Sequence, residues 1–398
     1  MPLFLLSLTV RTARAQVVNS VLLQWRAQAE KCEEPRQGDG LAMLHVAMFE
    51  AINSIVGKYT PYIARISAPP GSSVEAAASS AAHDIEIQVC PDMKSAFDAA
   101  LKTSLALVTD SVARENGVSV GRQAAAAILA ARAGSKADLR DPYFAATTAG
   151  TYVPTLQQVG MTWSLQKPWV MKAPDELRPP KPPALTSAKW ARDYNELKRI
   201  GGKTSKARTV EQTDIAKFWA GRSVRIVLPQ LVGMPGRSVV DDARFLALAE
   251  MAWADSFVAM MDGKYAYNFW RPVTAIRGAV MDSNDSTAAD STWEPLIRTP
   301  PHPEYPCGHC MSAAAVGTVV ALEFGDRPPA IVLEEKDAML RRYSKPQEYI
   351  DEVAEARVIG GIHYRNSADV GKAMGVSIGK LAVERYFKPQ RSSKPRDR

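Results

Sequence analysis

Residues 243–272 read ARFLALAEMAWADSFVAMMDGKYAYNFWRP, and this stretch is the most informative one for the fold. From Ala243 to Met261 apolar residues recur at three- and four-residue spacing, which predicts a helix. The same spacing recurs in segments 41–55, 74–89, 95–108, 118–132 and 187–200, whereas the alternation typical of strands is scarce. We therefore predict an all-α protein of two packed helical bundles with long proline-rich loops.

A proline-rich segment, residues 133–183, interrupts the helical pattern. A segment of that length without periodicity is usually functional or a linker. It separates a helical N-terminal part, residues 16–132, from a helical C-terminal part, residues 184–388, and residues 389–398 form a basic tail. Within the C-terminal part, Thr209 with Gln212 has the spacing of a capping box and predicts a helix start.

Composition excludes several classes of protein. The chain has 398 residues, 46% hydrophobic and 23% charged, which is typical of a globular protein and not of a disordered or collagen-like chain. No apolar run is long enough for a membrane-spanning helix. The net charge of +7 is spread along the chain, and no stretch has the pattern of a nucleic-acid-binding motif.

The N-terminus predicts a cellular location. Residues 1–15 contain a short apolar run followed by Ala13-Arg14-Ala15, the small-x-small pattern of a signal-peptidase site, although the usual basic start is missing. We interpret these residues as the remnant of a signal peptide and expect a periplasmic or secreted protein. A cytoplasmic protein whose first helix starts here is the alternative. A homo-oligomer is compatible with the sequence.

Four cysteines are also informative about the compartment. Cys32 and Cys90 are isolated, whereas Cys307 and Cys310 form a C-x-x-C pair. In an oxidising space they would close as disulfides, but sequence alone does not choose among three connectivities, and free buried thiols are the alternative.

Three segments of the C-terminal part combine cations, histidines and glycines. Lys264 and Arg271 lie seven residues apart among aromatic residues, and buried cations of this kind require an anion. Gly308 and His309 open an apolar helix, whose N-terminal amides are suited to bind an anion. Arg357 and His363 complete the set, which suits an oxyanion held by cations, with one histidine in line and another to move protons.

These segments resemble the signature of the vanadium-dependent haloperoxidases and the related type 2 phosphatidic acid phosphatase superfamily, which reads K-x6-R-P, P-S-G-H and S-R-x5-H. Here the signature stands as Lys264 to Pro272, Pro306 to His309 and Ala356 to His363. The stretches near residues 41, 178 and 208 also look like the bacterial haloperoxidase-like branch, so the resemblance covers most of the chain.

The resemblance implies a pocket for vanadate or phosphate in the C-terminal bundle. His363 would be the vanadium ligand, and His309 the general acid or base. The oxyanion would be bound by Lys264, Arg271, Arg357, the amide of Gly308 and residue Cys307. The implied reaction oxidises halide with hydrogen peroxide, polarised by Lys264, to hypohalous acid, which halogenates a small organic acceptor.

Two residues depart from the signature, and one further histidine refines the expected activity. Cys307 replaces a serine, and a thiol is a weaker donor and is readily oxidised. Ala356 replaces a second serine. His302 lies where bromoperoxidases resemble one another in having a histidine, which favours bromide or iodide, although a surface position in PPHPEYP is the alternative reading.

Two other activities stay open. An acid phosphatase would hydrolyse phosphomonoesters through a phosphohistidine at His363 in the same pocket. A thiol-disulfide oxidoreductase would use the C-G-H-C of residues 307–310, although its proline-rich approach is unlike the strand that precedes a thioredoxin-type site.

Overall fold

The computed structural model describes residues 20–32, 39–63, 65–134, 147–154, 156, 159–325, 329–333 and 341–390. Across these residues the chain is mostly helical, and the named strands are β1, Ile331–Leu333, and β2, Arg341–Tyr343, which pair antiparallel. The predicted all-α class is confirmed. No helix in the described part is both long and apolar enough to cross a membrane.

The chain divides into two compact units, each built from separate stretches of sequence. Unit 1 takes its described residues from 1–134, 227–254 and 382–398, and unit 2 from 135–226 and 255–381. Helix α9, Val239–Tyr267, belongs partly to each. The boundaries at residues 132, 183 and 388 stay a prediction, and the expected signal remnant, residues 1–15, and the tail from 391 lie outside the described residues.

Unit 1 contains the helices that the N-terminal periodicity predicts. They are α2, Val21–Ala29, α3, Gly40–Val56, α4, Val74–Val89, α5, Lys94–Ala106, and α6, Ser111–Arg132, with 3-10 turns at Pro91–Met93 and Pro229–Leu231. Helix α6 begins seven residues before the predicted start at residue 118, because the side chain of Asp110 accepts a hydrogen bond from Ala113 N–H and caps a polar first turn. A disulfide joins Cys32 to Cys90 in this unit.

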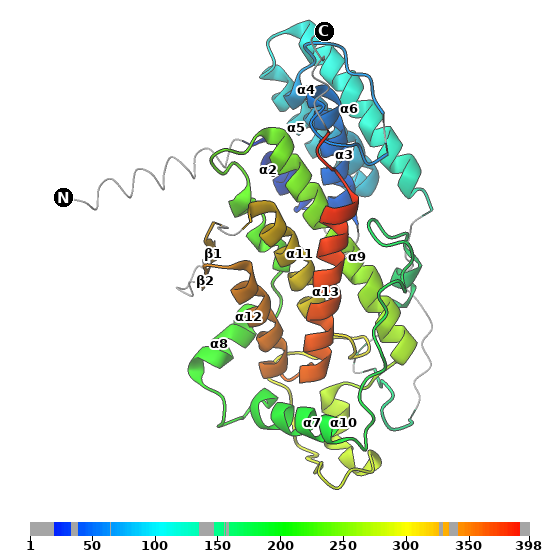
Figure 1. The fold of residues 1–398 in the computed structure, drawn as a ribbon, viewed down its shortest axis with the longest axis vertical. Coiled ribbons are helices and arrows are strands. Elements are labelled where there is room, and N and C mark those ends of the chain that lie inside the picture. Colours follow the sequence, from blue (N-terminus) through cyan, green and yellow to red (C-terminus); the bar gives the residue numbers. More distant parts are fainter. Residues whose placement is uncertain are drawn as a thin grey trace, which may run out of the picture. The chain divides into compact units, whose positions relative to one another are not determined.

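Unit 2 holds the segments of the signature (Figure 1). Its helices are α7, Ala188–Gly201, α8, Val210–Phe218, α10, Pro272–Arg277, α11, Gly308–Phe324, α12, Pro346–Ile359, and most of α13, Arg365–Arg385, with 3-10 turns at Met161–Leu165 and Ala279–Met281 and a further turn, Val224–Val227, at its edge. The capping box predicted at Thr209 is present, since its hydroxyl accepts from Gln212 N–H and its own N–H donates to the Gln212 side chain.

Helices α11 and α13 pack unusually closely along a row of glycines. Gly371, Gly375 and Gly379 recur at four-residue spacing, and a Cβ atom at any of them would lie within 2.1–2.6 Å of a backbone oxygen of residue 307, 311 or 315. Only glycine allows this approach, so α13 fixes the first turns of α11. The glycine row therefore positions the start of α11, where Cys307, Gly308 and His309 lie.

Candidate active site

Lys264 and Arg271 are fully buried beside the loop at residues 302–304. Lys264 lies in the last turn of α9, and its Nζ donates to the carbonyl oxygens of Pro303 at 2.8 Å and Glu304 at 2.7 Å. Arg271 stands at the N-cap of α10, and its Nε donates to the His302 carbonyl oxygen at 2.8 Å. The predicted pair is thus brought to one loop.

Arg357 completes the cation cluster from the last turn of α12. It is 2% exposed, and its Nη1 donates to the carbonyl oxygen of Trp219 at 2.9 Å. Its Nε is buried and has no hydrogen-bond partner among the described residues. A buried guanidinium N–H without an acceptor is costly, so this atom indicates where an anion would bind.

Burial is the main cause that lowers the pKa values of the three cations. Burial, and then the charge of Arg271, lowers the pKa of Arg357 to about 9. Burial lowers the pKa of Arg271 to about 10. For Lys264, burial followed by Arg271 lowers the pKa well below its ordinary value, and Glu304 opposes this shift. The cluster is therefore electrostatically suited to an anion.

His363 lies beside these cations, just after α12. Its Nδ1 is 2.7 Å from Glu304 Oε1, and its Nε2 is 3.4 Å from Arg271 Nη1. Burial, followed by the charges of Arg271 and Lys264, lowers its pKa well below the ordinary value, so the ring is neutral. The approach to His363 turns at Gly361, whose φ is +78° and whose Cβ would lie 2.3 Å from the Gly201 carbonyl oxygen.

Glu304 is a site residue that the sequence analysis missed. It is fully buried, and burial raises the pKa of its carboxyl group to about 7 against the opposing charges of Lys264 and Arg271. In the sequence it is an isolated acid among prolines and aromatic residues. The one signal in the sequence was that an acidic residue stands in an apolar loop. Such a residue requires a partner when it is buried.

His302 lies beside the cation cluster, since its ring contacts Arg271. Its Nδ1 is 2.9 Å from Arg271 Nη2, and the side chain is half-buried. Its Nδ1 also lies 3.2 Å from the carbonyl oxygen of Pro303. Burial, then the charges of Lys264 and Arg271, lowers its pKa well below the ordinary value. Its role in halide preference stays a prediction, as does the alternative of a surface histidine in the 300–306 loop.

Cys307, Gly308 and His309 form the start of α11, as predicted. Cys307 is the N-cap, and its Sγ accepts from Cys310 N–H at 3.3 Å. His309 is half-buried, and burial, followed by Arg357 and Lys264, lowers its pKa well below the ordinary value. The buried cations, the helix start and both predicted catalytic histidines therefore share one electrostatic environment.

The structure gives the oxidation state of Cys307, which the sequence left open. A disulfide joins it to Cys310, and both residues are 0% exposed. The expected weak thiol donor is therefore absent, since a disulfide sulfur has no proton to donate. The same burial opposes a thiol-disulfide oxidoreductase, because a substrate disulfide has no access to either sulfur.

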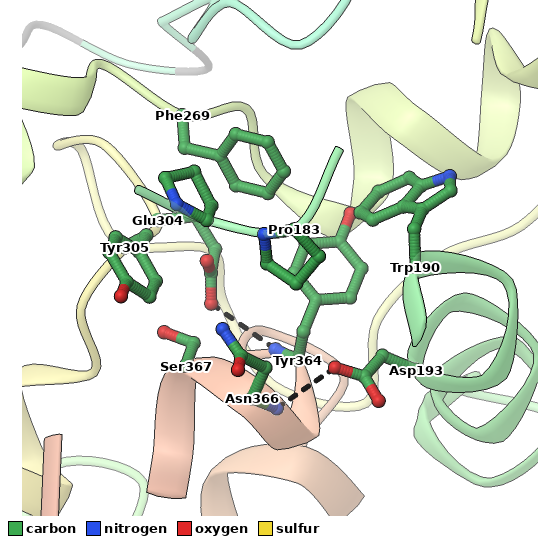
Figure 2. Close-up of a pocket in the computed structure, with 10 residues that line it drawn as sticks. Pro183, Trp190, Asp193, Phe269, Glu304, Tyr305, Tyr364, Asn366 and Ser367 are labelled. Atoms are coloured by element: carbon green, nitrogen blue, oxygen red, sulfur yellow. Dashed lines mark hydrogen bonds between the residues drawn. The ribbon is translucent and has the colours of Figure 1, made fainter. Parts of the chain in front are cut away.

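A small pocket is lined by Glu304, the residue that contacts His363 (Figure 2). In Figure 2 the carboxylate of Glu304 points toward Ser367 and Asn366, and Tyr364 N–H donates to Glu304 Oε1 at 3.2 Å. Asn366 N–H donates to Asp193 on another wall at 3.0 Å. Glu304 thus lies between His363 and this pocket.

Comparisons with known proteins agree with this geometry. Residues 244–391 match the family model described as the VCPO second helical-bundle domain. This matched range includes every predicted site residue. The structure of a protein described as the first bacterial vanadium-dependent iodoperoxidase superposes with a TM-score of 0.73, at 21% identity, and covers 97% of each chain.

Two forms of a bacterial vanadium-dependent chloroperoxidase are also similar. The apo form gives a TM-score of 0.70 at 16% identity over 87% of this chain and 91% of that one. The holo form gives the same score and identity over 92% of each chain. A search of curated proteins gives no match. The fold is therefore that of the bacterial vanadium haloperoxidases, and the resemblance of the motifs to this family is confirmed.

Proposed function

We propose that this chain is a vanadium-dependent haloperoxidase, which binds vanadate and oxidises halide with hydrogen peroxide to hypohalous acid. The observation that carries the proposal is the convergence of three buried cations on His363, with Arg357 Nε lacking an acceptor among the described residues. A tetrahedral oxyanion supplies the missing acceptors and the missing negative charge.

The residues present fit vanadate, and each has a role. Lys264, Arg271 and Arg357 would neutralise the oxygens of the anion, with the N-terminal amide of Gly308 as a further donor. His363 would ligate vanadium through Nε2, because its Nδ1 contacts Glu304. Bound vanadate would supply a Lewis-acidic centre that activates hydrogen peroxide toward halide. His309, neutral in the anion-free site, would hold or release the proton at the anion.

The substrates are proposed on narrower grounds. His302 contacts Arg271, and by the resemblance stated above a histidine here favours bromide or iodide over chloride. The match to an iodoperoxidase structure agrees with that preference. A small organic molecule would accept the halogen.

An acid phosphatase is the alternative for the same site, because phosphate and vanadate have the same shape and charge. His363 Nε2 would attack phosphorus while the phosphorus–oxygen bond to the leaving alcohol breaks, and His309 would protonate that alcohol. Water would then hydrolyse the phosphohistidine. The orientation of the His363 ring suits either reaction.

We also propose export to an oxidising compartment, periplasmic or secreted. Both disulfides, Cys32–Cys90 and Cys307–Cys310, support it, because disulfides persist mainly outside the reducing cytosol.

The test is halogenation of a phenolic dye by vanadate-free protein, with bromide, iodide or chloride and hydrogen peroxide, before and after vanadate is added. A chromogenic phosphomonoester is assayed in parallel. We expect halogenation only with vanadate, lost in His363→Ala and kept in His83→Ala, whose ring contacts Asp84 and Asp98 in unit 1. Phosphate release that vanadate inhibits, without halogenation, would identify a phosphatase instead.

A further inference from the structure

Glu304 contacts two of the groups that the proposed site depends on. Its side chain accepts from His363 Nδ1 at 2.7 Å and from Tyr364 N–H at 3.2 Å. Its backbone oxygen accepts from Lys264 Nζ at 2.7 Å, and its own N–H donates to Phe269 O at 2.9 Å. The backbone of Glu304 is therefore held by Lys264 and Phe269. Its carboxylate is held by Tyr364 N–H, the amide of the residue after His363.

The contacts on the two ring nitrogens of His363 agree on one tautomer. Burial raises the pKa of Glu304 to about 7, and above that pH its carboxylate only accepts, so the proton of the neutral ring lies on Nδ1. Arg271 Nη1, 3.4 Å from Nε2, only donates, so Nε2 carries a lone pair. Both neighbours thus leave Nε2 as the electron-pair donor, which a vanadium ligand or a nucleophile requires.

We propose that Glu304 is a positioning residue for His363, which fixes the Nδ1–H tautomer and the ring plane so that Nε2 faces the oxyanion. This inference rests on the proposed function. A different role is conceivable on charge alone, since Glu304 offsets the neighbouring cations. The two roles make opposite predictions, because loss of the charge would by itself strengthen the binding of every anion.

Three substitutions separate these roles. Glu304→Gln keeps an acceptor at the same distance and removes the charge. Glu304→Asp keeps the charge and shortens the side chain by one methylene group, about 1.5 Å, which breaks the contact to Nδ1. Glu304→Ala removes both. The measurement is the ratio of the Kd for inorganic phosphate to the Kd for vanadate. A change of charge affects both Kd values alike and cancels in the ratio. The effect of the His363 orientation stays in the ratio, because only vanadate bonds to Nε2.

We expect the wild-type ratio in Glu304→Gln and a decrease of about 10- to 100-fold in Glu304→Asp and Glu304→Ala, the range for residues that support a metal ligand. An unchanged ratio in all three, with tighter phosphate binding in Glu304→Gln and Glu304→Ala, would overturn the proposal. If the variants bind neither anion and also lose their thermal unfolding transition, Glu304 has a structural role, and the proposal is likewise overturned.

A second readout is independent of anion binding. Nitrogen-15 NMR of histidine-labelled protein, with the His363 signals assigned by His363→Ala, reports which ring nitrogen is protonated. We expect Nδ1–H in wild type and Glu304→Gln, and mixed tautomers in Glu304→Asp and Glu304→Ala. If wild-type protein binds neither anion, the proposed function is refuted, and the NMR spectra then still test whether Glu304 sets the His363 tautomer. If all variants show the same tautomer, the positioning role of Glu304 is refuted.

Discussion

Replacement of Arg357 by methionine should abolish anion binding and yet stabilise the anion-free protein. Burial and the charge of Arg271 lower the pKa of Arg357 from its ordinary value to about 9. That decrease of three to four units corresponds to roughly 5 kcal/mol, at about 1.4 kcal/mol per unit. Because the folded-state pKa lies below the unfolded-state value, this destabilisation is fully present below pH 9 and is relieved only as the pH rises through 9.

The net gain is smaller than that figure. Methionine keeps most of the apolar stem, but the carbonyl oxygen of Trp219 loses its donor, which costs about 1–3 kcal/mol. We therefore expect a stabilisation on the order of 2 kcal/mol in phosphate-free buffer. Wild type should in turn gain about 2.7 kcal/mol from phosphate at 100 times its Kd, a gain that Arg357→Met lacks.

Calorimetric unfolding with and without phosphate measures both effects, and Arg26 provides a matched control. Arg26 is equally buried, but its Nη1 contacts Glu250 at 2.6 Å. Arg26→Met removes the ion-pair partner of this buried carboxylate, so it should lose about 3–5 kcal/mol while phosphate still protects. The reasoning is refuted if Arg357→Met is destabilised like Arg26→Met or is still protected by phosphate.

Further predictions concern the anion and the halide. Between pH 8 and 9.5, where phosphate is already a dianion, its affinity should fall as the pH rises, because the anion raises the lowered pKa values of Lys264 and Arg357 and binding takes up protons. Calorimetry in two buffers of different ionisation heat should show that uptake in wild type and a smaller one in Lys264→Met. Cys307→Ser combined with Cys310→Ala restores a hydroxyl donor and should bind phosphate about three- to tenfold more tightly, whereas an unchanged Kd would mean that residue 307 does not face the anion. His302→Phe should raise the ratio of chloride to bromide turnover, and an unchanged ratio would remove His302 from halide selection.

Local patterns predicted the helices and the chemistry-bearing segments. Helix α4 and the capping box at Thr209 follow from spacing and cap residues alone, since both depend on neighbours within one turn. Lys264, Arg271 and His363 were identified because buried cations and histidines in apolar segments need a common explanation. The structure brings them together as expected.

Long-range contacts set the limit of that prediction. Glu304 and His363 are 59 residues apart, and no periodicity connects a loop acid to a helix end. Arg357 donates to the carbonyl oxygen of Trp219, a backbone atom that every residue possesses. The sequence therefore gives no sign of this contact. The same limit explains His302, whose burial depends on Arg271.

The disulfide at the start of α11 changes what the glycine–histidine motif contributes. A serine at residue 307 would donate a hydroxyl to the oxyanion, whereas the Cys307 sulfur accepts from Cys310 N–H and has no proton. The anion would then be held by the three cations and the amide of Gly308, at a loss of about 1 kcal/mol for the missing donor. A free thiol at this position would be oxidised by hypohalous acid, but a fully buried disulfide presents no thiolate to the oxidant. The substitution is therefore compatible with haloperoxidase turnover as long as Cys307 and Cys310 stay joined.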